Sequence, residues 1–379
     1  MRTNSTANFR YHQPGAMRGL RNITWLIMAS LLAFFSLAHA QDETSTQGVE
    51  ETLGNLPQTA AQEFAQPLVN AVGANLNTGW MTMAPEAKMS GLTLRLGLVG
   101  VGSFIDGEDD IFQLLGTIFQ FQENEARELA RMGIAGFDLL PQTQQDAIVE
   151  EIATSEFTAD VTGPTVFGGE NDKLVVTTEA KEITVDNITY IIPSETITFD
   201  DVTGLWDKGI FPTVVPQLSL GTFYGTQATI RYLPDVKLSE DIGTLSYFGW
   251  GIQHNPLVWF QNPLPVNIAV SFFKQSLKID EAVKVNTTAY GAQVSKTFGG
   301  FLASVTPYAG FLIESSNMDV DYTYEVYPGV TTNIEFELEG ENSSRFILGV
   351  GANVVGLNIY ADYNFSKLNS ANITLMYGF

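Results

Sequence analysis

The stretch 370-SANITLMYGF-379 closes the chain and alternates between apolar residues and small or polar ones. Successive side chains of a β-strand point to opposite faces, so Ile373, Leu375 and Tyr377 fall on one face. The last residues of a soluble protein usually trail into solvent, whereas Phe379 ends this chain on an aromatic ring. We therefore predict that the C-terminus is a wall strand rather than a tail.

The same period of two recurs along the chain. Leu92, Leu94, Leu96 and Leu98 alternate with residues that include an arginine, and the pattern returns within 227–232, 248–253, 266–272, 290–295, 346–354 and 357–365. Strands of about 9–11 residues with one apolar and one polar face are the signature of an outer-membrane barrel. A soluble β-sandwich also alternates, but its strands are commonly shorter. The predicted fold is all-β, a transmembrane antiparallel up-and-down β-barrel.

Connection lengths predict the number of strands and their sidedness. Bacterial barrels have an even strand count, short periplasmic turns and longer external loops. Short turns are expected near 222–224, 257–263, 298–300 and 354–357, and external connections near 235–241, 277–284, 323–342 and 366–370. This gives ten strands, or twelve if a hairpin within 173–199 joins the wall, and fourteen at most.

The first forty residues have the pattern of a secretory signal peptide. Arg18 and Arg21 precede the apolar run ITWLIMASLLAFFSLAHA, which ends on Ala38-His39-Ala40. We expect cleavage after Ala40, with either Met1 or Met17 as the start. The rest of the chain has no apolar run of 18 residues, so membrane insertion would require a closed sheet.

Composition excludes several classes of function. Residues 1–40 hold four of the 19 basic residues and none of the 42 acidic ones, which leaves 15 against 42, a net charge of −27. Nucleic-acid binding is not expected from such a chain, because it needs clustered Lys and Arg. Cysteine is absent, and His254 is the single histidine after residue 40. No metal site, other cofactor or catalytic residue is predicted; a remote alternative is a lipid hydrolase with His254 beside a serine.

The mature chain divides into three predicted parts. Residues 41–58 are predicted to form a disordered acidic linker. Residues 59–87 form a hatch-like segment with a helix over about 59–74. The barrel covers 88–379, and its segment 105–210 is an insertion of two or three short helices and a hairpin, acting as an external lid or a lumenal plug.

Three sets of residues are candidate sites. Charged side chains predicted to face the lumen, as structural pairs or as a solute-selecting eyelet, are Arg95, Arg231, Arg345, Asp362 and Glu314. Aromatic residues predicted to form a girdle at the membrane interface are Tyr247, Trp250, Trp259, Phe260, Tyr377 and Phe379. Ile373, Leu375, Tyr377 and Phe379 resemble the C-terminal signal that the barrel-assembly machinery reads in outer-membrane barrels of Gram-negative bacteria.

Several internal segments carry a narrower resemblance. They are NTGWMTMAP, VPQLSLGTFYGTQATIRYLP, YFGWGIQHNPLVWF and LPVNIAVSFFKQSLKI. They resemble an uncharacterised family of outer-membrane barrels that is grouped loosely with the long-chain fatty-acid transporters (FadL-like). That resemblance implies an N-terminal hatch inside the barrel and hydrophobic substrates that leave through the wall. No binding residue is transferred.

The function expected from the sequence is passive transport of a small molecule, hydrophobic ones included, across the outer membrane. The alternative is a structural or adhesive surface barrel that does not conduct. Expected partners are outer-membrane lipid and lipopolysaccharide, the barrel-assembly machinery, periplasmic chaperones and a small hydrophobic ligand.

Overall fold

The computed structural model describes residues 58–119, 121, 123–194, 196–199, 203–204, 206, 208–239, 243–262, 264–280, 282–300, 302–327 and 330–378. The predicted signal peptide, the residues of the acidic linker before 58, and Phe379 lie outside them. No helix in these ranges is long and apolar enough to cross a membrane.

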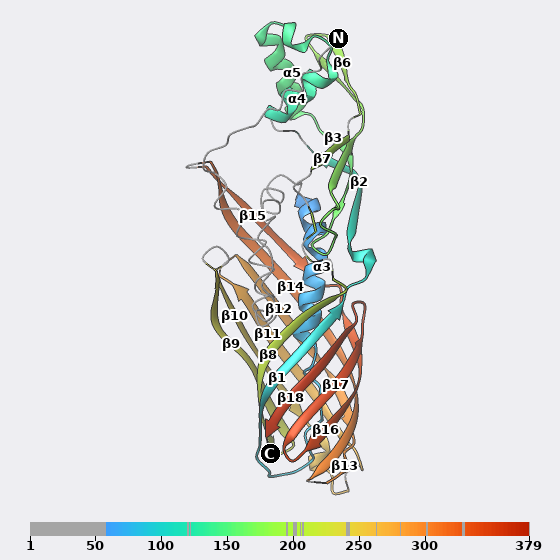
Figure 1. The fold of residues 1–379 in the computed structure, drawn as a ribbon, viewed down its shortest axis with the longest axis vertical. Coiled ribbons are helices and arrows are strands. Elements are labelled where there is room, and N and C mark those ends of the chain that lie inside the picture. The colour runs from blue at the N-terminus through green and yellow to red at the C-terminus, as the bar shows by residue number, and fades with distance from the viewer. Residues whose placement is uncertain are drawn as a thin grey trace, which may run out of the picture.

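Ten strands form a closed antiparallel wall (Figure 1). They are β1 (Thr93–Phe104), β8 (Ile210–Phe223), β9 (Thr226–Ser239), β10 (Gly243–His254), β11 (Asn267–Ile279), β12 (Val283–Ser295), β14 (Ala303–Tyr327), β16 (Ser344–Val354), β17 (Leu357–Phe365) and β18 (Ser370–Gly378). The last strand pairs with the first, from Arg95 opposite Gly378 to Ser103 opposite Ser370. Closure leaves no unpaired edge. The prediction of an antiparallel barrel of ten to twelve strands is confirmed, and the number is ten.

Two further strands pair with β14. The short β13 (Phe298–Gly299) lies beside its start, and β15 (Val330–Glu339) pairs with its second half. Because β14 is 25 residues long, it forms with β15 a hairpin that projects past one end of the barrel (Figure 1).

The two ends of the barrel differ in their connections. At the end we call the short-turn end, Tyr224–Gly225 and Val355–Gly356 join neighbouring strands, and the 3-10 helix η3 (Pro256–Trp259) lies in a longer connection. The opposite end, which we call the domain end, carries the segment 105–209 between β1 and β8 (Figure 1).

The segment 105–209, here called the insertion domain, has its own secondary structure. A four-stranded sheet contains β2 (Ile111–Phe119), β3 (Phe157–Pro164), β4 (Leu174–Thr178) and β7 (Thr196–Phe199). A separate hairpin of β5 (Lys181–Val185) and β6 (Ile188–Ile192) shares an apolar core with α4 (Glu123–Gly133) and α5 (Gln142–Thr154). The hairpin expected within 173–199 is thus four strands in two sheets, and none of them joins the wall.

The wall alternates between the two faces as the sequence predicts. On β1, Leu94, Leu96 and Leu98 are exposed on the outer face, while Val99 and Val101 on the other face are buried. The outer faces of β16, β17 and β18 are equally apolar and exposed. An exposed apolar band therefore surrounds the wall.

The helix α3 (Gln58–Asn77) stands along the barrel axis, and the chain after it runs down through the barrel to the short-turn end (Figure 1). It ends three residues later than the predicted helix. All residues from 71 to 77 are buried, so this part is enclosed on every side. A small residue is needed where α3 approaches the wall, because a Cβ on Gly73 would lie only 2.2 Å from Ser316 Oγ on β14.

Candidate functional site: the occupied lumen

The lumen is filled by the chain that precedes β1. After α3, Gly79 turns the backbone with φ of +73°, a conformation that favours glycine. Trp80 and Met81 are then buried among residues of the wall. The Trp80 indole stacks on Phe273 with ring centroids 5.0 Å apart, and its Nε1 donates to Leu76 O over 2.8 Å.

Hydrogen bonds fix this segment along its whole path. Ala84 N donates to Ser295 Oγ over 3.1 Å, and Asn255 Nδ2 donates to Pro85 O over 2.7 Å. At the short-turn end, Gly225 N donates to Lys88 O over 3.0 Å. We call residues 58–85 the plug, because they occupy the lumen from the domain end to the short-turn end.

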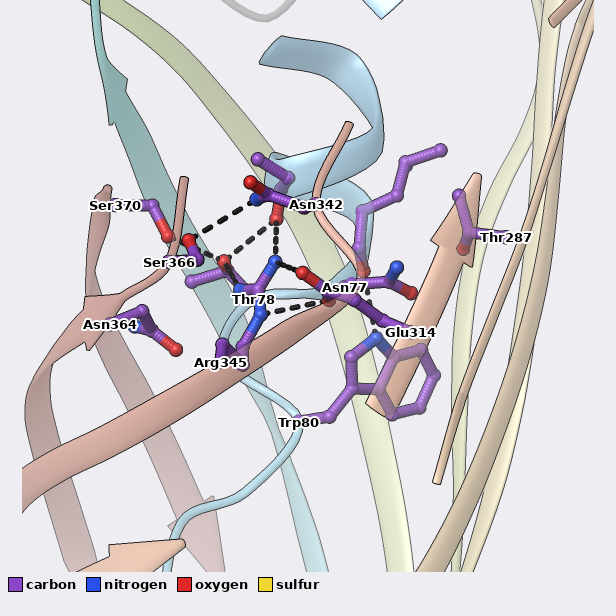
Figure 2. Close-up of polar contacts among 12 residues, drawn as sticks. Asn77, Thr78, Trp80, Thr287, Glu314, Asn342, Arg345, Asn364, Ser366 and Ser370 are labelled. Carbon is purple, nitrogen blue, oxygen red and sulfur yellow. Dashed lines mark hydrogen bonds and ion pairs between the residues drawn. The ribbon is translucent and has the colours of Figure 1, made fainter. Parts of the chain in front are cut away.

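A buried ion pair joins the plug to the wall. Arg345 on β16 donates two hydrogen bonds of 2.8 Å to the Glu314 carboxylate on β14. Its Nη2 also donates to Ala74 O over 3.1 Å, and its Nη1 donates to Thr78 Oγ1 (Figure 2). Both side chains are almost fully buried. Each of these hydrogen bonds is charge-assisted, which makes the cluster rigid and specific.

Arg231 on β9 approaches the plug from another side. Its Nε donates to Gln217 Oε1 over 2.8 Å, and its Nη1 donates to Thr78 O over 2.9 Å. The guanidinium lies 4.0 Å from the Trp80 ring centroid, within cation–π range. Thr78 therefore contacts both buried arginines, one through its carbonyl and one through its hydroxyl.

The fourth buried charge, Asp362 on β17, is satisfied by neutral donors. Tyr308 Oη donates over 2.7 Å, Asn364 Nδ2 donates over 2.6 Å, and Asn372 Nδ2 also donates to this carboxylate. Arg95 is half-buried near the short-turn end, opposite Gly378. The structure thus brings Arg345 and Glu314 into a pair but gives Asp362 hydrogen bonds instead of a direct ion pair.

The aromatic candidates do not form one girdle. Trp250, Trp259, Phe260 and Tyr377 are exposed, but Trp250 lies beside Phe272 within the wall and Trp259 stacks on Tyr224 at the short-turn end. Ile373 and Leu375 are exposed on the outer face beside Tyr377.

The assignment of Tyr247 to the girdle is wrong. Tyr247 is buried inside the barrel, where its Oη donates to Gln275 Oε1 over 2.5 Å. An odd spacing of three residues from Trp250 puts the two rings on opposite faces of β10.

His254 lies at the end of β10 beside the short-turn end. Its Nδ1 is 3.0 Å from Thr226 Oγ1, and its Nε2 accepts from Trp259 Nε1 over 3.3 Å. Both ring nitrogens are thus bonded to a threonine and a tryptophan, and the serine that a hydrolase would need is not one of these partners.

The insertion domain is attached to the top of the plug. Val166 N donates to Phe64 O over 3.0 Å, and Trp206 N donates to Val166 O over 3.1 Å. Phe167, Trp206 and Phe211 pack edge to face at this junction. The domain, the plug and the start of β8 therefore share one hydrophobic core.

Sequence reasoning missed the residues that hold the plug. These residues become important only through contacts that the sequence does not show: Thr78 bonds wall residues 153 and 292 positions away, Trp80 stacks on Phe273, and Gln217 and Tyr308 bond residues on other strands. The one local signal was the change from a helical pattern to the polar NTGW sequence at 77–80.

Known structures give only weak likenesses. A loop L8 deletion mutant of OmpT, an outer membrane protein of Vibrio cholerae, is 10% identical over 76% of this chain and 100% of its own, with a TM-score of 0.21. The outer membrane channel DcaP of Acinetobacter baumannii is 10% identical over 78% and 100%, with a TM-score of 0.16. The FrpB iron transporter of Neisseria meningitidis is 10% identical over 77% and 54%, with a TM-score of 0.17.

No curated protein matches the sequence. The grouping with fatty-acid transporters stays a prediction. A family model does match, over residues 17–379. Since that match spans nearly the whole chain, the protein belongs to the family of unknown function DUF6588.

Proposed function

We propose that this protein is an outer-membrane barrel with a closed lumen, and that its working surface is the part outside the cell. The insertion domain and the β14–β15 hairpin form that surface. The barrel anchors them in the membrane and holds them in one orientation through the plug.

Membrane insertion is supported by the outer face of the wall. Leu96, Leu348, Ile359 and Leu375 come from four different strands and are each more than 40% exposed. A contiguous exposed apolar band of this kind is rare on soluble monomers. It is the lipid-facing surface of an outer-membrane barrel.

Sidedness follows from the connections. Outer-membrane barrels have short turns on the periplasmic side and long connections outside. On this basis the short-turn end faces the periplasm, and the domain end faces the exterior. The insertion domain would then stand at the cell surface.

The main support for a closed lumen is that the plug fills it. A ten-stranded barrel is narrow, since side chains alone fill an eight-stranded one. Here a helix and a following strand-like segment also lie inside, bound by Arg345, Arg231 and Asn255. Passive transport, the function expected from the sequence, would require residues such as Trp80 and Met81 to leave the lumen.

Conductance in planar bilayers tests this proposal. We expect the wild-type protein to insert without stepwise conductance. A Trp80→Ala, Met81→Ala variant should leak, because it removes the two large side chains from the lower lumen. Trp250→Ala is the matched control on the outer face and should show no conductance. Stable steps from the wild-type protein would overturn the proposal and favour passive transport.

Protease treatment of intact cells tests the sidedness. Trypsin should cut the insertion domain at Arg131 or Lys181, which lie on its surface, while leaving Lys88 and Lys296 at the short-turn end intact. The reverse pattern would place the insertion domain in the periplasm and contradict a role at the cell surface.

A further inference from the structure

Basic residues are scarce in this protein, and their distribution is uneven. Of the 15 after residue 40, three lie on the inner face of the barrel, five in the insertion domain, two at the short-turn end and one between β17 and β18. The remaining four are on the wall strands β9, β11 and β12: Lys237, Lys274, Lys278 and Lys284. One side of an acidic protein thus carries a group of cations.

Three of these lysines project from the outer face of the sheet. On β11 the alternate residues Phe273, Gln275 and Leu277 are buried, whereas Lys274 and Lys278 are exposed. Lys284 on β12 is exposed as well, and it lies directly opposite Lys278 in the register. We call Lys274, Lys278 and Lys284 the lysine patch.

Neighbouring carboxylates compensate the charge of the patch only in part. No ion pair joins its three ammonium groups to other described residues. The nearest carboxylates in the sheet are Asp319, opposite Lys284, and Asp280, which accepts from Thr244 N over 2.7 Å. Like charges directly across two strands destabilise a sheet. Asp319, opposite Lys284, offsets part of the repulsion between Lys278 and Lys284, and a further anion bound between the two lysines would offset the rest.

The patch lies just beyond the apolar band. Val270 and Phe272 are the preceding outward residues on β11, and Lys274 follows Phe272 by about 7 Å along the strand. Lys274 is opposite Trp250, an exposed aromatic on β10. Aromatic rings of this kind lie at membrane interfaces, and long lysine side chains extend from the apolar region to the headgroups. The patch therefore faces sideways into the headgroup layer at the domain end.

We infer that the lysine patch binds the phosphate groups of lipid A in the outer leaflet. This rests on the proposed outer-membrane location, which puts the domain end outside. Phosphate is the anion that compact ammonium groups bind as point charges. A ligand anchored in the leaflet fits a patch that faces along the membrane and adjoins Trp250 and Phe272, which would contact the acyl chains.

Binding of diphosphoryl lipid A to the purified full-length protein in detergent micelles tests the inference. The variant K274Q/K278Q/K284Q should bind about 100-fold more weakly, since a lysine near an anionic surface contributes roughly a tenfold or slightly smaller factor. The matched control K88Q/K208Q/K296Q removes three charges elsewhere and should bind within about twofold of the wild-type protein, because screening limits distant charges. Dephosphorylated lipid A should bind all three proteins equally weakly.

Three outcomes would overturn the inference. They are wild-type affinity in the patch variant, equal losses in both triple variants, and displacement of lipid A by inorganic phosphate at the same phosphate concentration. The heat-dependent gel shift of a folded barrel verifies that each variant is folded. Insertion into liposomes separates the two proposals: a protein that inserts but binds lipid A without the patch refutes only the inference, whereas one that fails to insert refutes the outer-membrane assignment.

Discussion

The two halves of the barrel interior are built on different chemistry. Toward the short-turn end, the inner face is mixed. Gln217, Thr229, Gln253 and Gln293 are buried there, together with an apolar cluster around Trp80 and Met81 of the plug. Toward the domain end, the inner face is apolar and packs on α3. Its members include Leu245, Leu277, Ile279, Val283, Val285, Met318, Val320, Phe336 and Leu338.

The polarity of the outer face changes in the opposite direction, from apolar toward the short-turn end to charged toward the domain end. On β11, outward Val270 and Phe272 give way to Lys274 and Lys278, while inward Ser271 gives way to Leu277 and Ile279. The strand keeps its period of two, but its outer face inverts from apolar to charged about halfway along, whereas Phe273 and Gln275 keep the inner face mixed. We interpret this inversion as the membrane boundary: below it lipid is the outer solvent, and above it water is.

The largest expected effect comes from breaking the lower attachment of the plug. Arg345→Ala leaves Glu314 buried without its cation, and we expect a loss of about 3–5 kcal/mol in the free energy of unfolding. Urea unfolding in detergent measures it. The double change R345M/E314M removes both charges and should recover most of the loss. Equal stability of the single variant and the wild-type protein would contradict the ion pair's structural role.

Truncation in the upper half should act through packing alone. Leu68 on α3 is 2% exposed within the apolar cluster, so Leu68→Ala is expected to cost about 2–5 kcal/mol. The same unfolding measurement applies. Leu375→Ala, on the outer face, is the matched control and should cost less, because detergent fills the space that its side chain leaves.

A charge scan across the outer face tests the polarity inversion. Val350 lies in the middle of the apolar face of β16, and Val350→Arg should cost about 2–4 kcal/mol in a bilayer. Asn286→Arg, on the outer face of β12 beyond the boundary, should cost at most about 1 kcal/mol. Similar losses at both positions would show that the two regions meet the same solvent.

The smallest effect is expected in the insertion domain, away from the barrel. Arg127 Nη2 lies 2.9 Å from Asp146 Oδ1 and holds the pKa of that carboxyl below its ordinary value. A lowered pKa stabilises the folded state while the carboxyl is ionised, so the contribution is lost as the pH falls below about 4. Asp146→Asn should therefore lower the melting temperature of the protein slightly at pH 7, and by less at pH 3.

The fold was largely readable from local patterns. Alternation placed Ile373, Leu375 and the three outward leucines of β1 on the correct face, and connection lengths limited the wall to ten or twelve strands, of which ten are observed. The same rule places Arg231, Arg345 and Asp362 on the inner face, where they are buried. It assigned no face to the strand that contains Pro307 and Glu314, and only the structure shows Glu314 buried beside Arg345. Tyr247 was misplaced where that rule was not applied.

The sequence by itself determined the barrel, because period-two alternation is local: each residue's face follows from its immediate neighbours. The contents of the lumen were decided only by the tertiary structure. Whether α3 lies outside the barrel or within it depends on the hydrogen bonds that Thr78 accepts from Arg231 and Arg345, each more than 150 residues away in the sequence. These long-range contacts depend on the register of the whole closed wall, and no local sequence pattern encodes that register.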